Sequence, residues 1–103
     1  MVFVEASIFT KRLMDYFNDN EYREFQNYLM EHPGTGDIIQ GTGGLRKIRW
    51  TASGKGKRGG TRIIYYWEIA HQQIYLLTLY AKNEMSDLSA NDKKVLKEML
   101  ERW

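Results

Sequence analysis

Seven positively charged side chains lie in one glycine-rich stretch near the middle of the chain. The stretch runs from residue 41 to residue 66, and the nearest acidic residues on either side are Asp37 and Glu68. Its cations are Arg46, Lys47, Arg49, Lys55, Lys57, Arg58 and Arg62. Such a concentration of positive charge attracts polyanions, and nucleic acid is its commonest partner.

The charge is divided unevenly along the chain. Residues 1–37 have three basic and seven acidic groups, a net charge of −4. Residues 38–67 have a net charge of +7, and residues 68–103 have a net charge of −1. The overall charge of +2 therefore hides a basic segment, and the N-terminal third would repel a nucleic acid strand.

The basic stretch also has the pattern of a β-hairpin. Residues 45–51 and 61–68 are rich in β-branched and aromatic side chains, and a glycine-rich connection joins them. Alternation places Lys47 and Arg49 on one face of the first strand. If the register sets Arg62 beside them, three cations converge, an arrangement that a purely structural hairpin avoids. A solvated outer face of a sheet is the alternative.

The whole chain predicts one α+β domain over residues 1–103. The order β-α-α-β-β-β-α is expected, with a small, mostly antiparallel sheet packed against helices. Expected strands cover residues 2–5, 45–51, 61–68 and 74–81.

Capping and breaking residues place the helices. Ser7 is expected to cap the first helix, and residues 18–20 end it and cap the second. Pro33 ends the second helix, and a capping box of Ser89 and Asp92 begins the last. Residues 33–44 are expected to form a loop that carries Ile38 and Ile39 back against the body of the protein.

Composition argues against several functional classes. No apolar run approaches the ~18 residues that a membrane span needs. There is no cysteine, and no pair of histidines or carboxylate cluster suggests a metal, so neither metal nor cofactor is expected. The N-terminal residues lack the pattern of a secretory signal, which favours the cytoplasm. Residues 54–59 match G-x-G-x-x-G but precede a strand, whereas a dinucleotide site needs a helix there.

Three segments together resemble the RelE-type toxins, most closely their HigB branch. They read GTGGLRKIR, GKGKRGGTRIIYY and YAKNEMSDLS, and the similarity extends over nearly the whole chain. The resemblance implies the toxin of a bacterial type II toxin–antitoxin module. Such toxins enter the ribosomal A site and cut mRNA without a metal, by attack of a ribose 2′-OH that leaves a 2′,3′-cyclic phosphate.

The resemblance also implies partners. These are a cognate, HigA-like antitoxin, the bacterial ribosome and mRNA. Operator DNA is expected only through the toxin–antitoxin complex, and no membrane is expected.

Site residues follow from the positions that match the family. Lys47, Arg49, Arg62 and Lys82 are the candidate catalytic residues. Candidates for contacts with RNA or the ribosome are Arg46, Lys55, Lys57, Arg58 and Asn83.

These residue types suit cleavage at phosphorus. Fixed guanidinium groups stabilise the negative charge that develops on the phosphate oxygens, and an arginine fork grips two of them. Crowding by Arg49 and Arg62 favours the neutral form of a lysine, so Lys47 is the candidate general base. Lys82 is the candidate general acid.

One feature of the family is missing. Many RelE-type toxins have a tyrosine near the start of the last helix, where this chain has Leu88 and Ser89. Tyr80 and Trp50 are the candidates to stack on a base in its place.

Two other functions fit the same residues. One is a non-catalytic RNA- or DNA-binding module in which the hairpin only grips phosphates. The other is a RelE-like fold that has lost activity and binds a partner. A cleaving site needs its cations within reach of one phosphate, whereas a gripping surface spreads them along a line.

Overall fold

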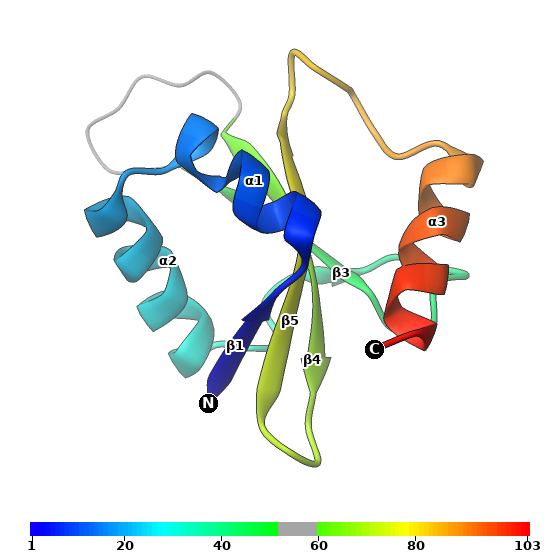
Figure 1. Ribbon diagram of the computed structural model, residues 1–103, viewed down its shortest axis with the longest axis horizontal. Helices are drawn as coiled ribbons and strands as arrows, with labels where there is room; N and C mark the ends of the chain where they lie inside the picture. The colour runs from blue at the N-terminus through cyan, green and yellow to red at the C-terminus, as the bar shows by residue number, and fades with distance from the viewer. Residues whose placement is uncertain (52–59) are drawn as a thin grey trace.

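The computed structural model describes residues 1–51 and 60–103, which form eight helices and strands (Figure 1). The predicted order is confirmed, with one short strand added before the hairpin. The elements are β1 (Val2–Glu5), α1 (Ser7–Tyr16), α2 (Asp19–Glu31), β2 (Asp37–Ile38), β3 (Arg46–Trp50), β4 (Thr61–Glu68), β5 (Gln73–Ala81) and α3 (Ala90–Glu101).

The strands make one mixed five-stranded sheet in the order β1-β5-β4-β3-β2. β1 pairs with β5 in parallel, although two helices and three strands separate them in the sequence. All other neighbours are antiparallel. The α+β class and the mostly antiparallel sheet are therefore as predicted.

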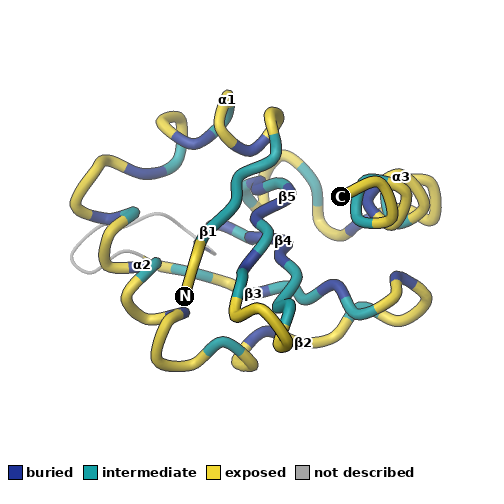
Figure 2. Tube along the Cα trace, turned by 60° about the horizontal axis from the view of Figure 1, so that its bottom comes forward, coloured by how far each residue is buried: buried dark blue, intermediate teal, exposed yellow. Residues whose placement is uncertain are grey.

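Helices cover both faces of the sheet. α1 and α2 pack on one face and α3 on the other, as Figure 1 shows. Alternation along β4 divides its side chains between two cores: Ile63 and Tyr65 face α1 and α2, while Ile64 faces α3. In Figure 2 the buried residues follow the strands and the inward sides of the helices.

Side-chain caps fix the starts of two helices. Asn18 and Glu21 form a reciprocal capping box at α2, and Ser89 and Asp92 form another at α3. Both starts agree with the sequence prediction. The prediction for α1 is wrong by one residue, since Ser7 is the first helical residue and Ala6 occupies the cap without a side-chain bond.

The segment before β3 differs from the expected loop. It contains β2, whose two residues pair with Arg46 and Lys47. Ile38 was expected to face the body but is 58% exposed, whereas Ile39 packs against the α3 core. A two-residue strand is too short for a pattern of alternation to reveal it.

A buried tyrosine holds this segment against the sheet. The Tyr65 hydroxyl donates to the Pro33 carbonyl at 2.8 Å and accepts from the Gly36 N–H at 2.9 Å. A Cβ on Gly36 would meet the Tyr65 ring at 2.8 Å, so only glycine fits there. Burial raises the pKa of Tyr65, which keeps the hydroxyl protonated and able to donate.

None of the helices in the described part of the chain is both long and apolar enough to cross a membrane.

Tyr65→Phe should lower the free energy of unfolding by about 1–3 kcal/mol, because it leaves the Gly36 N–H and the Pro33 carbonyl without their partner. The measurement is urea denaturation at neutral pH. Tyr66→Phe is the matched control: it removes a half-buried hydroxyl with no bond among the described residues and should change stability by less than about 0.5 kcal/mol. Equal effects of the two variants would contradict the role given to the Tyr65 hydroxyl.

Candidate nucleic-acid interface

The register of the hairpin brings three cations onto the α3 side of the sheet. Arg49 lies directly opposite Arg62, and Lys47 lies opposite Ile64, one step along the same face. Directly opposed side chains have Cβ atoms about 4.5–5.5 Å apart, and like charges in such a pair repel each other. Arg49 is exposed, while Lys47 and Arg62 are half-buried.

The backbone before Arg62 is fixed by a glycine. Gly60 has a φ of 70°, and a Cβ there would meet the Trp50 carbonyl oxygen at 2.7 Å. Arg62 donates from its guanidinium to the Gly60 carbonyl at 3.2 Å. β4 therefore begins at a defined point, and Arg62 projects from its second residue.

Lys47 has an acidic partner that sequence reasoning missed. Its Nζ lies 3.2 Å from Oδ1 of Asp87, which also accepts the Leu88 N–H at 2.8 Å. The Leu88 N–H first, and then Lys47, lower the pKa of Asp87, so this carboxylate stays charged. No sequence pattern predicts a contact across 40 residues.

Lys82 and Asn83 lie in the turn that follows β5. Ala81 pairs with Thr61, so this turn lies at the end of the sheet where β4 begins. Both side chains are exposed, and neither has a hydrogen bond or ion pair within residues 1–51 and 60–103. Lys82 and Arg62 therefore come from the same end of neighbouring strands.

The other predicted RNA-contacting cations are placed differently. Arg46 is one residue out of step with Lys47 and lies on the opposite face. Its guanidinium donates to the carbonyls of Gly34 and Gly36, at 3.1 and 2.8 Å, so this geometry gives no support to RNA binding. Lys55, Lys57 and Arg58 lie outside the described residues.

Neither candidate aromatic residue is free to stack from the cationic face. Tyr80 pairs with Arg62 but is only 1% exposed, and burial raises its pKa. Trp50 lies on the other face of the sheet, with its ring centroid 5.3 Å from those of Phe25 and Tyr28. Stacking on a base therefore requires a different aromatic side chain.

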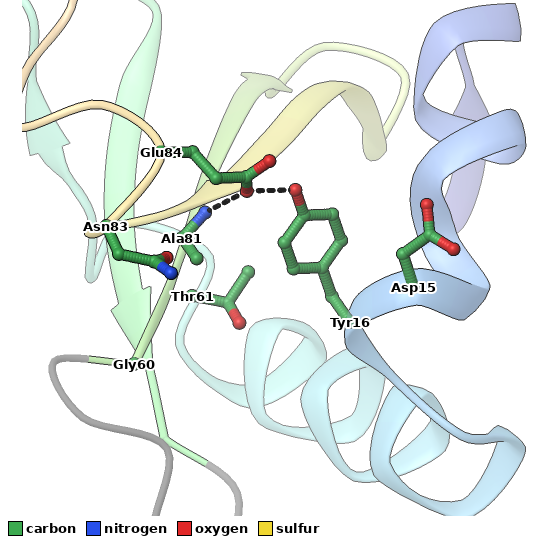
Figure 3. A pocket seen from close by; sticks show the side chains of 7 residues that line it. All are labelled: Asp15, Tyr16, Gly60, Thr61, Ala81, Asn83 and Glu84. Carbon is green, nitrogen blue, oxygen red and sulfur yellow. Dashed lines mark hydrogen bonds between the residues drawn. The ribbon is translucent and has the colours of Figure 1, made fainter.

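A cleft of about 640 Å³ lies at the same end of the sheet, on the α1 side (Figure 3). Its lining residues come from the end of α1, the start of β4 and the turn after β5. They are Asp15, Tyr16, Gly60, Thr61, Ala81, Asn83 and Glu84. Within the described residues, His, Asp and Glu side chains form no group of three that suits a metal ion.

A family model for the RelE toxin of the RelE/RelB toxin–antitoxin system matches residues 34–103. The chain belongs to the RelE toxin family. The matched range contains the hairpin, the turn after β5 and α3, which together carry every described cation of the interface.

Solved structures of RelE toxins share the fold. The toxin in the intact E. coli RelBE toxin–antitoxin complex superposes with a TM-score of 0.59 at 12% identity, over 78% of this chain and 94% of that one. A double arginine-to-alanine mutant of E. coli RelE in the free state gives 0.58 at 11% identity, over 82% and 86%. At these identities the likeness concerns the fold alone.

Asp87→Asn should tighten binding of single-stranded RNA several-fold, because Lys47 loses its competing carboxylate while the amide oxygen can still accept the Leu88 N–H. One additional phosphate contact should steepen the dependence of log affinity on log salt by about 0.7. The measurement is fluorescence anisotropy of a labelled oligonucleotide over a salt series.

Glu24→Gln is the control, because it removes one negative charge from the exposed side of α2. An increase in affinity no larger than in this control would show that Asp87 does not limit Lys47.

Proposed function

We propose that this RelE-family toxin is a ribosome-dependent mRNA endonuclease of the HigB type that cuts in the A site. The observation that carries the proposal is the opposed pair Arg49 and Arg62, with Lys47 next on the same face and Lys82 at the same end of the sheet. Cations clustered in this way suit contact with a single phosphate, whereas cations spread along a line would suit binding along an extended strand. Residues 1–103 act as a single toxin domain in this proposal.

The reaction is an in-line displacement at phosphorus. The ribose 2′-OH loses its proton and bonds to phosphorus, the bond to the 5′-oxygen breaks, and that oxygen takes up a proton. The products are a 2′,3′-cyclic phosphate and a 5′-hydroxyl. Arg49 and Arg62 stabilise the charge that builds on the non-bridging oxygens.

Two lysines are assigned to the proton transfers. Lys47 accepts the proton of the 2′-OH, and Lys82 donates to the leaving oxygen. Lys47 first has to leave Asp87 and release one ammonium proton to solvent, since only the neutral amine can accept the proton of the 2′-OH. Arriving RNA displaces Asp87, and the neighbouring charges of Arg49 and Arg62 favour loss of the lysine proton.

Dependence on the ribosome follows from what this face lacks. His32 caps the end of α2 and His71 lies in the turn between β4 and β5, and both are exposed. Neither belongs to the cationic face, so no strong base is in place among the described residues. Alignment of the mRNA by the ribosome supplies what the isolated site lacks.

The proposed partner is an antitoxin, by analogy with the E. coli RelBE complex whose toxin shares the fold. We assign it a HigA-like character, with acidic or apolar groups that cover the basic face. Operator DNA is bound through that complex only. The proposed site of action is the bacterial cytoplasm, where ribosomes and mRNA are.

A non-catalytic nucleic-acid-binding module is the second candidate. The observation that favours it is the Lys47–Asp87 ion pair, because a lysine that pairs with a carboxylate can pair with a phosphate in the same way. A RelE fold that retains only partner binding is a further alternative. Rates of cleavage separate these functions from the proposed one.

Purified protein should cut mRNA on programmed ribosomes and scarcely cut the same RNA when it is free, because the ribosome aligns the reacting groups. The measurement is mapping of 5′ ends after incubation with each substrate. Equal cleavage of the two substrates would rule out ribosome dependence, and no cleavage of either would favour the binding module.

Arg62→Ala should lower the single-turnover cleavage rate by roughly two to three orders of magnitude, the usual cost of losing one pre-organised donor. Ribosome binding should change much less, because the other cations of the stretch remain. Arg23→Ala removes an equal charge from the exposed side of α2 and serves as the control. A wild-type rate for saturated Arg62→Ala would remove Arg62 from the catalytic residues.

A further inference from the structure

The cleft on the α1 side has no role in phosphate chemistry as described so far. It lies across the strand ends from the cations: Thr61 lines it, while the next residue, Arg62, points to the opposite face. Asn83 lines it too, and Lys82 immediately precedes Asn83. The cleft and the cations therefore lie at the same end of the sheet, on its two faces.

An aromatic ring spans the cleft, and two hydrogen bonds hold its hydroxyl. The Tyr16 hydroxyl donates to Oε1 of Glu84 and accepts from Arg12 at 2.7 Å. Oε1 of Glu84 also accepts the Ala81 N–H at 2.8 Å, and its other oxygen lies 3.2 Å from Arg12. Figure 3 shows Tyr16 reaching from α1 across to Glu84. A fixed ring suits base stacking, which the cationic face cannot supply.

The pKa values of Tyr16 and Glu84 are shifted by these same contacts. Burial first, and then the bond to Glu84, raise the pKa of Tyr16. The Tyr16 bond first, and then the Ala81 N–H, lower the pKa of Glu84. The hydroxyl is therefore a donor and the carboxylate an acceptor at neutral pH.

Two polar side chains of the cleft have unused hydrogen-bonding capacity. Within the described residues, neither the Asp15 carboxylate nor the Asn83 amide has a hydrogen-bond partner. They lie on opposite sides of the cleft in Figure 3, Asp15 on α1 and Asn83 on the turn after β5. Glu84 is paired with Arg12, so Asp15 is the carboxylate of the lining that disfavours phosphate and favours a neutral ligand that donates hydrogen bonds.

We propose that this cleft binds one base of the mRNA, stacked on Tyr16 and read by Asp15 and Asn83, with guanine preferred and uracil disfavoured. Guanine presents two neighbouring donors, N1–H and the N2 amino group, which one carboxylate can accept together. Uracil presents one N–H between two carbonyl oxygens, and these oxygens face the carboxylate unfavourably. The proposal rests on the proposed cleavage of mRNA and adds a source of codon preference to it.

The two faces at the strand ends suit different parts of a nucleotide, which supports this assignment. Phosphate contacts position RNA without reading it, and base edges carry the sequence. Sequence-specific proteins read unpaired RNA bases by stacking on aromatic side chains together with hydrogen bonds to the base edge. The cationic face supplies the first kind of contact and the cleft the second.

The first experiment measures single-turnover cleavage on ribosomes programmed with codons that differ only by G or U, at each position in turn. At one position the wild type should cut the G codon about tenfold or more faster, since a good bidentate pair discriminates by about 1–3 kcal/mol. Asp15→Asn should reduce that ratio to near one while cutting the U codon at least as fast. Glu24→Gln, the control with the same change in charge, should keep the wild-type ratio. An unchanged ratio in Asp15→Asn, or a wild type without a G-over-U preference, would overturn the proposal.

The second experiment separates this inference from the proposed function. Guanosine 3′-monophosphate and uridine 3′-monophosphate are titrated into the full chain without ribosomes, and the NMR signals of Tyr16 and Asn83 are followed. The guanine nucleotide should shift both signals, and Asp15→Asn should weaken that binding several-fold. A guanine-selective shift without any mRNA cleavage would support the cleft and overturn the nuclease. Cleavage of mRNA together with equal shifts from both nucleotides would support the nuclease and overturn the role of the cleft.

Discussion

The pairing of β3 with β4 is the constraint on which the site depends. The buried pair Ile48 and Ile63 fixes this register, because a slip of one residue would turn every buried side chain of β3 to the wrong face. Burying each isoleucine contributes about 1.5–3 kcal/mol. Cross-strand pair effects amount to about 0.2–1 kcal/mol, so the cost of opposing Arg49 to Arg62 is smaller than the gain from packing. The apolar side of the hairpin therefore imposes the like-charged pair on the other side.

The segment between β5 and α3 is held at two points on opposite sides of the sheet. Glu84 bonds to Tyr16 and Arg12 of α1, and Asp87 bonds to Lys47 of β3. The two carboxylates have different roles. The oxygens of Glu84 accept from Tyr16, the Ala81 N–H and Arg12, and these bonds order the turn. Asp87 instead binds Lys47, which RNA phosphate can also bind. Exposed ion pairs of this kind contribute little to stability, so Asp87 is easily displaced.

Sequence reasoning recovered the fold and the face of the sheet that carries the cations, because both follow from local patterns. Alternation placed Lys47, Arg49 and Arg62, and breaking and capping residues placed α2 and α3. The bond of Lys47 to Asp87 and the bond of Tyr16 to Glu84 join residues that are 40 and 68 positions apart in the sequence. No local pattern encodes such contacts. The bonds of Arg46 to the carbonyls of Gly34 and Gly36 are likewise absent from any local pattern, and its contact with RNA stays a prediction.

The two-residue repeat of a strand gives this small sheet two functional surfaces at one end. Thr61 and Arg62 are neighbours in β4 but point to opposite faces, one toward the cleft and one toward the cations. A nucleotide has its phosphate and its base on different sides of the ribose, so it can place one group on each face. Each face also holds an ion pair: Arg12 lies 3.2 Å from Glu84 at the cleft, and Lys47 lies 3.2 Å from Asp87 on the cation side. Alternation along β4 therefore lets one end of a five-stranded sheet present cations to a phosphate on one face and the cleft to a base on the other.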